Sequence, residues 1–413
     1  MAKLPKYVER KTCRVCHNKI TEILDLDKTP LADRFVDSPN APETYYPLKL
    51  AICPSCHLVQ NKIDVNDQEL FATEYAFFSG TTSSVQHFKD YAETVKNLYP
   101  EQSKGFVIEI GSNDGTLLKE FKGAKMLIGI DPADKPVEKA RKDLGKDTGP
   151  FGLEQGFFDS KWIKKVYNHH DLTLIMANNV LAHVIDPLDF MKGVEWLLSK
   201  DGVAVFEFQY LPDLIFKNEF DNVYHEHRSF FSLTSFNYMV KKAGLMIEHV
   251  RHIDMQGGSL RVYLRQKGHK QMSSVKELLS DEKCIGMDRL EIFQGLQARL
   301  NYNKFILLNL LSGLKLQGKI IYGYGASAKS TTMFNYYGIN DRLITKIADT
   351  TPFKFSKFSP GVHIPIIKQS DKDMPDYYLV SVWNYLPQIL EREKKFIKAG
   401  GKFIVPIPFV EVI

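Results

Sequence analysis

The sequence predicts an α/β protein in which a small cysteine-rich domain precedes two units of sheet and helix. Three observations predict this class. Four of the five cysteines lie before residue 57. From about residue 106, short apolar runs alternate with helical patterns, which is typical of a parallel sheet covered on both faces. Near residue 320, after a long helical segment, a strand, a glycine-rich turn and a helix start a second such unit.

Length and composition limit the possible classes of protein. A chain of 413 residues is too long for one ordinary core. The expected parts are a first domain over 1–68, a central domain over 69–268, a helical connector over 269–316 and a C-terminal domain over 317–413. The net charge is only +5 and no basic stripe is present, so nucleic acid is not expected as a partner.

The sequence gives no sign of export or membrane insertion. Residues 1–11 are charged and lack the apolar stretch of a signal peptide. No apolar run approaches the roughly 18 residues that a membrane span needs. We therefore expect a cytoplasmic location, where thiols stay reduced, and no membrane partner. The oligomeric state is left open, with a monomer as the expectation.

The first domain contains two Cys-x-x-Cys pairs, Cys13 with Cys16 and Cys53 with Cys56. Two such pairs bring four thiolates to a tetrahedral site suited to Zn²⁺. No position is left open for water, so the expected role of the zinc is structural. The alternative is redox-active or free thiols.

The central domain begins with an apolar strand over residues 106–110, which ends at a glycine-containing turn from Gly111 to Gly115. Twenty residues after Gly111, Asp131 ends the next strand, where a carboxylate can accept hydrogen bonds from ribose hydroxyls. An NAD site would use the same glycine turn and the same ribose-binding carboxylate. However, the third glycine of that motif is absent, and Asp114 stands where phosphates collect at a helix start. S-adenosylmethionine (SAM) carries no phosphate and is favoured.

Residues 219–227 crowd acidic groups, two histidines and a phenol together. One reading is a solvated charged loop. Apolar flanks argue against it, since Val203 to Phe208 precede the stretch and Phe230 and Phe231 follow it. Neighbouring ionisable groups shift one another's pKa in the way that acid/base catalysis requires. A zinc protease motif is excluded, because its second histidine would fall on Ser229.

The C-terminal unit carries a loop from Gly323 to Ser330 that is one residue short of a phosphate-binding loop, since Ala328 replaces the glycine before Lys329. The favoured interpretation is a cradle for the diphosphate of a nucleotide sugar. A purely structural turn and an ATPase are the alternatives. Asp349 and Asn384, at the ends of neighbouring predicted strands, would line the same site.

Together these motifs resemble the sugar C-methyltransferases that act at C3 of nucleotide-activated 4-keto-6-deoxyhexoses. The resemblance covers nearly the whole chain. The segments that resemble the family are the cysteine pairs, Glu109 to Gly115, Asn179 to His183, Glu219 to His227, Gly257 to Val262 and Gly323 to Lys329. The family commonly has tyrosine where this chain has Phe230.

The resemblance implies a fold class: α/β, with a small N-terminal zinc-binding domain, a Rossmann-like class I SAM methyltransferase domain and a C-terminal Rossmann-like α/β domain. It also implies an enolate mechanism. His227 would be the base, Glu226 or a neighbour would orient its imidazole, and Tyr224 would hydrogen-bond the enolate oxygen. The alternatives are an O-methyltransferase acting on a nucleotide-linked sugar and a non-catalytic binder of nucleotide sugars.

The expected site residues follow from the motifs and the resemblance together. The expected SAM-binding residues are Tyr75, Ser79, Glu109, Gly111, Asn113, Asp114, Gly115, Asp131, Phe158, Asp159, Asn178, Asn179 and His183. The residues expected to bind the sugar nucleotide are His225, Tyr324, Ser327, Lys329, Asp349 and Asn384. The expected zinc ligands are the four cysteines of the first domain.

Overall fold

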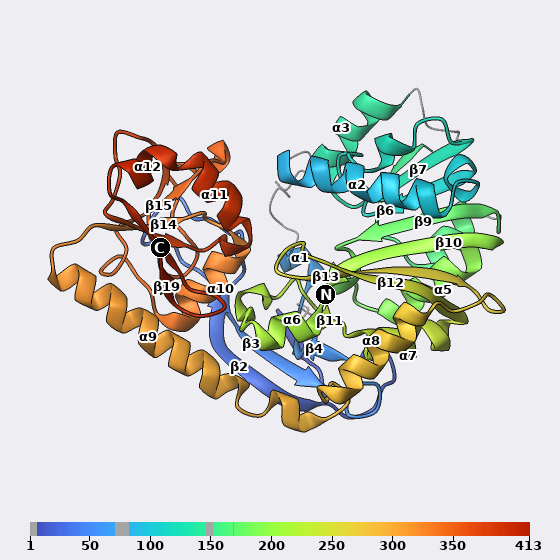
Figure 1. Cartoon of the computed structure of the whole chain (residues 1–413), viewed down its shortest axis with the longest axis horizontal. Helices are drawn as coiled ribbons and strands as arrows, with labels where there is room; N and C mark the ends of the chain where they lie inside the picture. Colours follow the sequence, from blue (N-terminus) through green and yellow to red (C-terminus); the bar gives the residue numbers. More distant parts are fainter. Residues whose placement is uncertain (1–5, 71–81, 146–151, 168) are drawn as a thin grey trace, which may run out of the picture.

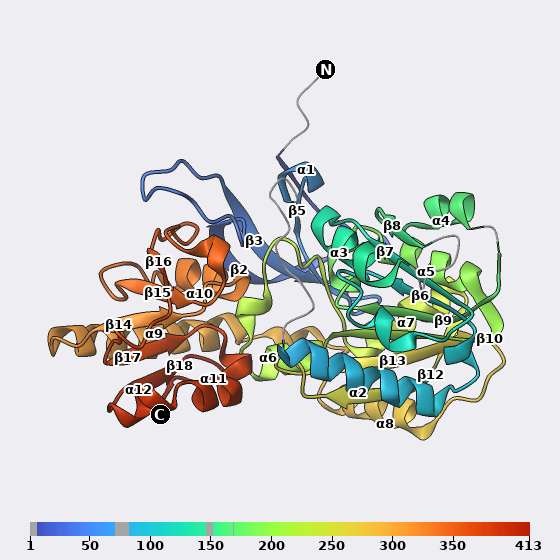
Figure 2. The same ribbon diagram turned by 90° about the horizontal axis from the view of Figure 1, so that it is seen from above.

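The structure is a computed structural model that describes residues 6–70, 82–145, 152–167 and 169–413. Figure 1 shows two α/β lobes with the N-terminal strands β2 and β3 running between and beneath them. Figure 2, turned by 90°, again shows these strands between the two lobes. Within the described ranges, no helix has the length and apolar character needed to cross a membrane.

The N-terminal domain is built from short strands around the two cysteine turns. It has a two-stranded sheet, β1-β5, and a four-stranded sheet in the order β11-β4-β3-β2. The elements of this region are β1 (Tyr7–Glu9), β2 (Thr21–Pro30), β3 (Tyr45–Ile52), β4 (Val59–Asn61), β5 (Ile63–Val65) and α1 (Asp67–Leu70). The edge strand β11 (Ser229–Phe230) comes from much later in the chain and pairs with β4. Residues 219–228 therefore lead directly into a strand anchored on this domain.

The central domain is a seven-stranded sheet in the order β12-β13-β10-β9-β6-β7-β8. Its strands are β6 (Phe106–Ile110), β7 (Met126–Asp131), β8 (Leu153–Gln155), β9 (Leu172–Asn178), β10 (Leu198–Gln209), β12 (Leu245–Ile253) and β13 (Ser259–Gln266). Strands β6 to β10 are parallel, and β13 runs antiparallel to both of its neighbours. The sheet is thus Rossmann-like, with one reversed strand.

Helices cover both faces of this sheet, as the sequence predicts. Along β6, Val107 packs with one face's core and Ile108 with the other, because successive strand residues point to opposite sides. The first core receives α2 (Thr82–Leu98) and α3 (Asp134–Leu144). The second receives α4 (Ser160–Val166), α5 (Pro187–Leu197), α7 (Leu233–Ala243) and α8 (Ser273–Cys284). The short helix α6 (Leu211–Phe216) leads into residues 219–228.

The C-terminal domain follows α9 (Leu296–Leu316) and has a six-stranded sheet in the order β16-β15-β14-β17-β18-β19. Its elements are β14 (Ile321–Tyr324), α10 (Ala328–Tyr337), β15 (Lys346–Asp349), β16 (Ile366–Lys368), β17 (Tyr377–Val380), α11 (Leu386–Arg392), α12 (Lys394–Lys398), β18 (Lys402–Val405) and β19 (Glu411–Val412). Only β19 is antiparallel to its neighbour in this sheet.

Single 3₁₀ turns connect many of these elements. They are Gln102–Lys104, Leu118–Phe121, Leu181–His183, Phe220–Asn222, Leu290–Phe293, Pro352–Lys354 and Trp383–Tyr385. Strand boundaries differ from expectation by a few residues. The sequence predicts a strand from Lys319 to Tyr322, whereas β14 runs from Ile321 to Tyr324, and the backbone N–H of Ile320 just before it bonds the carboxylate of Asp376 at 2.8 Å.

Candidate active site

The four cysteines of the N-terminal domain meet at one point. Their Sγ atoms all lie within 4.8 Å of one another. The Sγ–Sγ distances are 3.5 Å for Cys13–Cys56 and 3.3 Å for Cys16–Cys53. A disulfide would need about 2.0 Å, whereas four thiolates at about 2.3 Å around one zinc lie about 3.8 Å apart. The residues therefore fit a structural Zn²⁺ site, as expected.

The central domain holds its glycine turn by a specific pattern of backbone contacts. Gly111 has φ +74°, and its N–H bonds the carbonyl of Ile130 at 2.7 Å. A side chain here would meet Val180 Cγ2 at 2.2 Å, so only glycine fits. The carboxylate of Asp131 accepts the N–H of Asn113 and that of Ala133, both at 2.9 Å. The loop is fixed before any ligand binds.

Two side chains beside this loop carry buried polar atoms that lack partners among the described residues. They are Glu109 Oε2 and both side-chain atoms of Asn178. Glu109 lies on β6 and Asn178 at the end of the adjacent β9. Burial, followed by the charge of Asp131, raises the pKa of Glu109 well above its usual value. Unsatisfied groups of this kind fit the amino-acid end of SAM, whose ammonium would pair with the carboxyl.

Several predicted SAM residues have other partners. The carboxylate of Asp114 accepts from Lys139 at 3.1 Å and Thr116 at 2.6 Å, which holds the first turn after the loop. Phe158 is buried against Phe190, at 4.8 Å between ring centroids. Asp159 caps α4, accepting the N–H groups of residues 161 and 162. Phe158 thus packs in the core and Asp159 caps a helix, and the contact of both with SAM stays a prediction. Tyr75 and Ser79 lie outside the described residues.

Segment 219–228 is held by all three domains. From the C-terminal domain, Thr332 Oγ1 donates to the carbonyl of Val223 at 2.9 Å, and Trp383 Nε1 donates to Asp221 Oδ2 at 2.7 Å. From the N-terminal domain, the N–H of Asn61 bonds the carbonyl of Arg228 at 3.0 Å. We call this meeting point the three-domain junction. A segment fixed at both ends and from two sides can hold side chains in a defined geometry.

At the junction, Tyr224 and His227 form a hydrogen-bonded pair. The Tyr224 hydroxyl lies 2.6 Å from His227 Nε2, and His227 Nδ1 lies 2.8 Å from the backbone carbonyl of Asn222. A carbonyl only accepts, so Nδ1 carries the proton and Nε2 presents its lone pair to Tyr224. Burial, followed by the nearby His183, holds the pKa of His227 well below its usual value. The imidazole is neutral and has the tautomer that a base at Nε2 requires.

The Asn222 carbonyl therefore orients this imidazole, in the role that the sequence gave to Glu226 or a neighbour. Glu226 is half-buried, and burial followed by the charge of Asp33 raises its pKa to about 8. His183 lies edge-on to His227 at 4.9 Å between centroids, so it links the end of β9 with His227. Burial and then Arg228 lower the pKa of His183 to about 4.

His225 does not share the environment of its neighbours. Its side chain is 2% exposed, and Nε2 donates to the carbonyl of Pro47 on β3 at 3.1 Å. Its ring packs edge-on against Tyr46 at 5.7 Å. His225 therefore fastens the segment to the N-terminal domain through Nε2, and its buried Nδ1 has no partner among the described residues, so the predicted sugar contact stays a prediction.

The C-terminal loop repeats the contact pattern of the turn from Gly111 to Gly115. The N–H of Gly325 bonds the carbonyl of Ala348 at 2.8 Å, and Asp349 accepts the N–H groups of Ala326 and Thr351, both at 2.7 Å. A Cβ on Gly325 would meet Val382 at 2.8 Å, as one on Gly111 would meet its own valine. Both loops thus have the geometry of a Rossmann-like ligand turn.

Other predicted residues of this domain have structural contacts. Ser327 caps α10, with its hydroxyl accepting the N–H of Ser330 at 3.2 Å. The Tyr324 hydroxyl is buried and donates to Glu393 at 2.7 Å, and its predicted contact with substrate stays a prediction. Asn384 remains a candidate, because its Oδ1 is buried and has no partner among the described residues.

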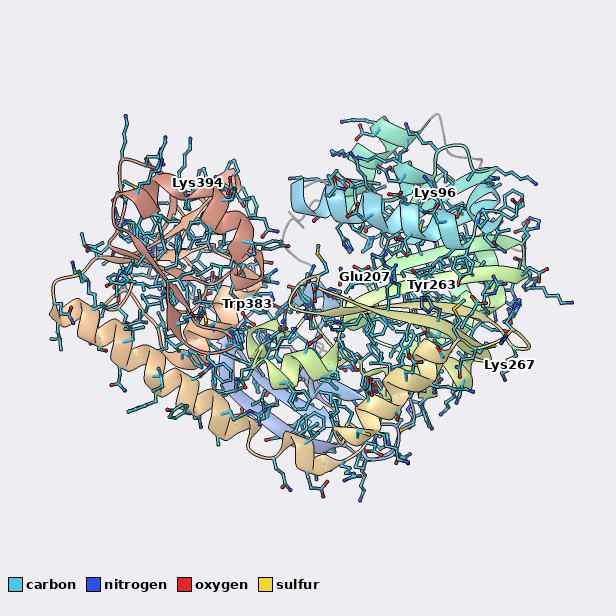
Figure 3. All side chains as sticks on the ribbon, viewed as in Figure 1. Lys96, Glu207, Tyr263, Lys267, Trp383 and Lys394 are labelled. Carbon is cyan, nitrogen blue, oxygen red and sulfur yellow. The ribbon has the colours of Figure 1, made fainter. Side chains whose placement is uncertain are left out.

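Lys329 points toward segment 219–228. Its Nζ is buried, lies 4.6 Å from the ring centroid of Trp383 and has no hydrogen-bond partner in the described part of the chain. Burial lowers its pKa, and the charges of Asp221 and Glu219 partly offset this. Figure 3 shows Trp383 on the side of its lobe that faces the central domain. The lysine is therefore available to a ligand at the junction.

Sequence reasoning missed a buried network at the end of β10. Glu207 lies 2.6 Å from His87 Nε2 and accepts from Arg261 Nε at 2.9 Å. Figure 3 shows Glu207 near the end of the central sheet that faces the other lobe. Glu207 pairs in register with Asn178, so the network adjoins the predicted SAM site. The acid at the end of the predicted strand was a signal, but its partners lie far away in sequence.

The fold and site define a SAM-dependent methyltransferase with an attached zinc-binding domain. Family models match three parts of the chain: "Putative zinc binding domain" over residues 13–71, "Methyltransferase domain" over 84–250 and "C-methyltransferase C-terminal domain" over 254–408. C-methyltransferase NovU of Streptomyces niveus is 32% identical over 410 residues, covering 97% of this chain and 96% of its own. The chain belongs to this C-methyltransferase family.

Solved structures resemble parts of the chain. A SAM-dependent methyltransferase from Clostridium acetobutylicum is 14% identical with a TM-score of 0.37, covering 44% of this chain and 92% of its own. Magnesium protoporphyrin IX methyltransferase from Synechocystis, with bound SAH, is 11% identical with a TM-score of 0.35, covering 47% of this chain and 91% of its own.

Proposed function

We propose that this C-methyltransferase acts at C3 of a nucleotide-linked 4-keto-6-deoxyhexose through an enolate. An aliphatic C–H bond becomes acidic enough for a protein base only next to a carbonyl, so carbon methylation requires a keto group in the substrate. The observation that carries the proposal is the neutral imidazole of His227, with Nδ1–H on the Asn222 carbonyl and the Nε2 lone pair directed at the Tyr224 hydroxyl. Bound SAM supplies the electrophilic methyl group.

In this proposal the Tyr224 hydroxyl has two partners in turn. Without substrate it donates to His227 Nε2 at 2.6 Å. With the keto sugar in place, it turns to the C4 oxygen, which frees Nε2 to take the C3 proton. Lys329 adds a positive charge near the same imidazole and stabilises the negative charge that develops on the enolate oxygen.

The C-terminal loop supports a nucleotide-linked substrate. Gly325 and Asp349 reproduce the backbone contacts of the SAM loop, and Asn384 offers a buried amide oxygen without a partner among the described residues. The nucleotide would bind there and place its sugar at the three-domain junction.

The test uses SAM with a panel of 4-keto sugar nucleotides and their 4-hydroxy analogues. Wild-type enzyme should methylate only the keto compounds, and NMR should place the new methyl on C3. General-base help is typically worth about 10²–10⁴-fold, so His227→Ala should lower kcat by at least that range while SAM binding persists. In deuterated water, any exchange at C3 should also depend on His227.

Turnover of a 4-hydroxy analogue with the methyl on oxygen would contradict carbon methylation and support the O-methyltransferase alternative. Tight binding of SAM and sugar nucleotide without any turnover would support the non-catalytic alternative. Absence of exchange alone decides nothing against the enolate, because a carbanion that is methylated faster than it is reprotonated shows none. The keto requirement is therefore the decisive measurement.

A further inference from the structure

The turn that follows β2, residues 31–36, reaches from the zinc-binding domain to the C-terminal domain. The N–H of Val36 bonds the carbonyl of Phe358 at 3.1 Å, and the N–H of Phe358 bonds the carbonyl of Val36 at 2.8 Å. Next to this bridge, the Phe35 ring lies edge-on to Phe353 at 6.3 Å. The turn is therefore held on both domains.

Arg34 on this turn carries a guanidinium whose Nε and Nη2 are buried and have no hydrogen-bond partner in the ranges that the structure describes. A buried cation without a partner is costly, and buried charges are normally paired. Arg261 in the central domain shows the usual solution, since it bonds Glu207 at 2.9 Å. Arg34 is partly buried, and its two buried donors, Nε and Nη2, lack such an acceptor among the described residues.

The surroundings of Arg34 place it at the three-domain junction. Its charge acts on Glu226 of segment 219–228, whose pKa is about 8, so Glu226 is mostly uncharged at pH 7. The neighbouring Asp33 is within range of Asp349 and Lys354 of the C-terminal domain. Lys354 Nζ also bonds the carbonyl of Ala326, in the proposed nucleotide loop, at 2.6 Å. Arg34 is thus close to Glu226, and the residue before it is close to Lys354, which contacts that loop.

We propose that Arg34 binds a phosphate oxygen of the substrate's diphosphate, which makes the zinc-binding domain part of the substrate site. This inference rests on the nucleotide-linked substrate of the proposed function. A planar guanidinium suits phosphate, because two of its N–H groups can bond two oxygens at once. The enolate oxygen is the other candidate acceptor, but the cation whose charge acts on His227 is Lys329.

The experiment measures binding of dTDP, UDP, CDP and GDP by calorimetry, and steady-state kinetics with a sugar nucleotide. Arg34→Met should weaken binding of the preferred diphosphate about 10- to 100-fold, as expected for lost bonds to a charged group, and should raise KM. SAM affinity, zinc content and circular dichroism should match wild type. Arg34→Lys keeps the charge and should recover part of the loss. Arg289→Met, at an arginine whose side chain is 65% exposed, is the matched control and should bind normally.

Diphosphate binding by Arg34→Met at wild-type strength would overturn the inference and leave the proposed function standing. A lower kcat with unchanged KM and diphosphate affinity would also overturn it, since the arginine would then act on the enolate. If wild-type enzyme binds none of the four diphosphates, the nucleotide-linked substrate itself is wrong. If Arg34→Met does not fold, equal diphosphate affinity of Arg34→Lys and wild type would count against the bidentate contact.

Discussion

Segment 219–228 buries more ionisable groups than it can keep charged at neutral pH. Burial raises the pKa of Glu219 to about 8, although Lys329 partly offsets the effect. Burial also raises the pKa of Asp221, which Lys329 and the Trp383 N–H counteract. With one buried ammonium near two buried carboxyls, the segment retains a proton at neutral pH that the unfolded chain would release.

This predicts a stability that falls with rising pH. Because the folded pKa of Glu219 lies above its ordinary value of 4.5, its contribution is fully present below about pH 4.5 and is lost as pH rises through 8. Glu219→Gln cannot ionise, so it should lack this loss. On going from pH 5 to pH 9, the free energy of unfolding of the variant should therefore rise relative to that of the wild type, by at most about 5 kcal/mol at 1.36 kcal/mol per pKa unit. Urea unfolding at both pH values measures this.

The control is Glu138→Gln, a change at an exposed glutamate of α3 that should follow wild type at both pH values. The same pH dependence in Glu219→Gln and wild type would contradict the assignment of the buried proton to Glu219.

The sequence located the crowded segment but not the partners of its side chains. The segment with Tyr224 and His227 was recognisable from its crowded acid/base groups. The orientation of the imidazole by the Asn222 carbonyl was not, because a backbone acceptor has no sequence signature. The contact of His225 with the N-terminal domain could not be foreseen, because residues two apart can face different domains, and only the packing against Tyr46 shows which.

At the scale of elements, the two glycine turns are positioned by strand ends that are adjacent in each sheet but distant in sequence. Gly111 needs room beside Val180, which follows β9, so a contact between two strand ends fixes the loop. A positive φ adds a second requirement for glycine. The loop is thus sensitive to a single added methyl group.

Gly111→Ala should therefore destabilise the protein by about 2–4 kcal/mol, from the left-handed backbone plus overpacking against Val180, and should weaken SAM binding. Gly123→Ala is a matched control, since it has φ +100° but nothing within 4 Å of the added Cβ. It should cost only about 1 kcal/mol and leave SAM affinity intact. Denaturant unfolding and calorimetry measure both.

A second substitution isolates the packing contribution. Val180→Ala in the Gly111→Ala background should recover part of the lost stability, because it removes the atom that the new Cβ meets at 2.2 Å. No recovery would show that backbone conformation alone requires glycine there.

Periodicity predicted the strands of the parallel core but missed strands at its margin. The apolar runs that became β6, β7, β9 and β10 are buried on both faces and are therefore unmistakable. Strand β12 mixes charged and apolar residues, since it lies at the edge of the sheet with only partial burial, and it was overlooked. The pairing of β11 with β4 could not be foreseen, because two-residue edge strands carry no period.

At the scale of the whole molecule, the zinc-binding domain braces the two lobes. Its strands β2 and β3 pass between them (Figures 1 and 2), β11 ties segment 219–228 to its sheet, and the turn at Val36 bridges to Phe358. The four cysteines hold the zinc-binding domain together. Loss of the metal should therefore affect the geometry of the three-domain junction, although the zinc is not expected to take part in the chemistry there.

We expect about one zinc per chain to co-purify. Cys53→Ser should reduce the folded yield more strongly than it changes kcat of the surviving protein, because structural zinc contributes on the order of 10 kcal/mol to small domains. Metal analysis, circular dichroism and activity per folded molecule measure this. Cys284→Ser, at the exposed cysteine on α8, is the control and should retain zinc and yield. A metal-free wild type of full stability would contradict the role of the zinc.

The brace also has a consequence for synthesis of the chain on the ribosome. Glu43, in the loop between β2 and β3, accepts the N–H of Gly361 at 2.7 Å and pairs with His363, which lies 320 residues further along the chain. At translation speeds of about 5–20 residues per second, this partner emerges roughly 15 to 60 s after Glu43. During that interval the nascent N-terminal domain has its four cysteines, but the C-terminal domain that it will contact has not yet been made. Early capture of metal would therefore keep the waiting domain folded until the last strands are translated.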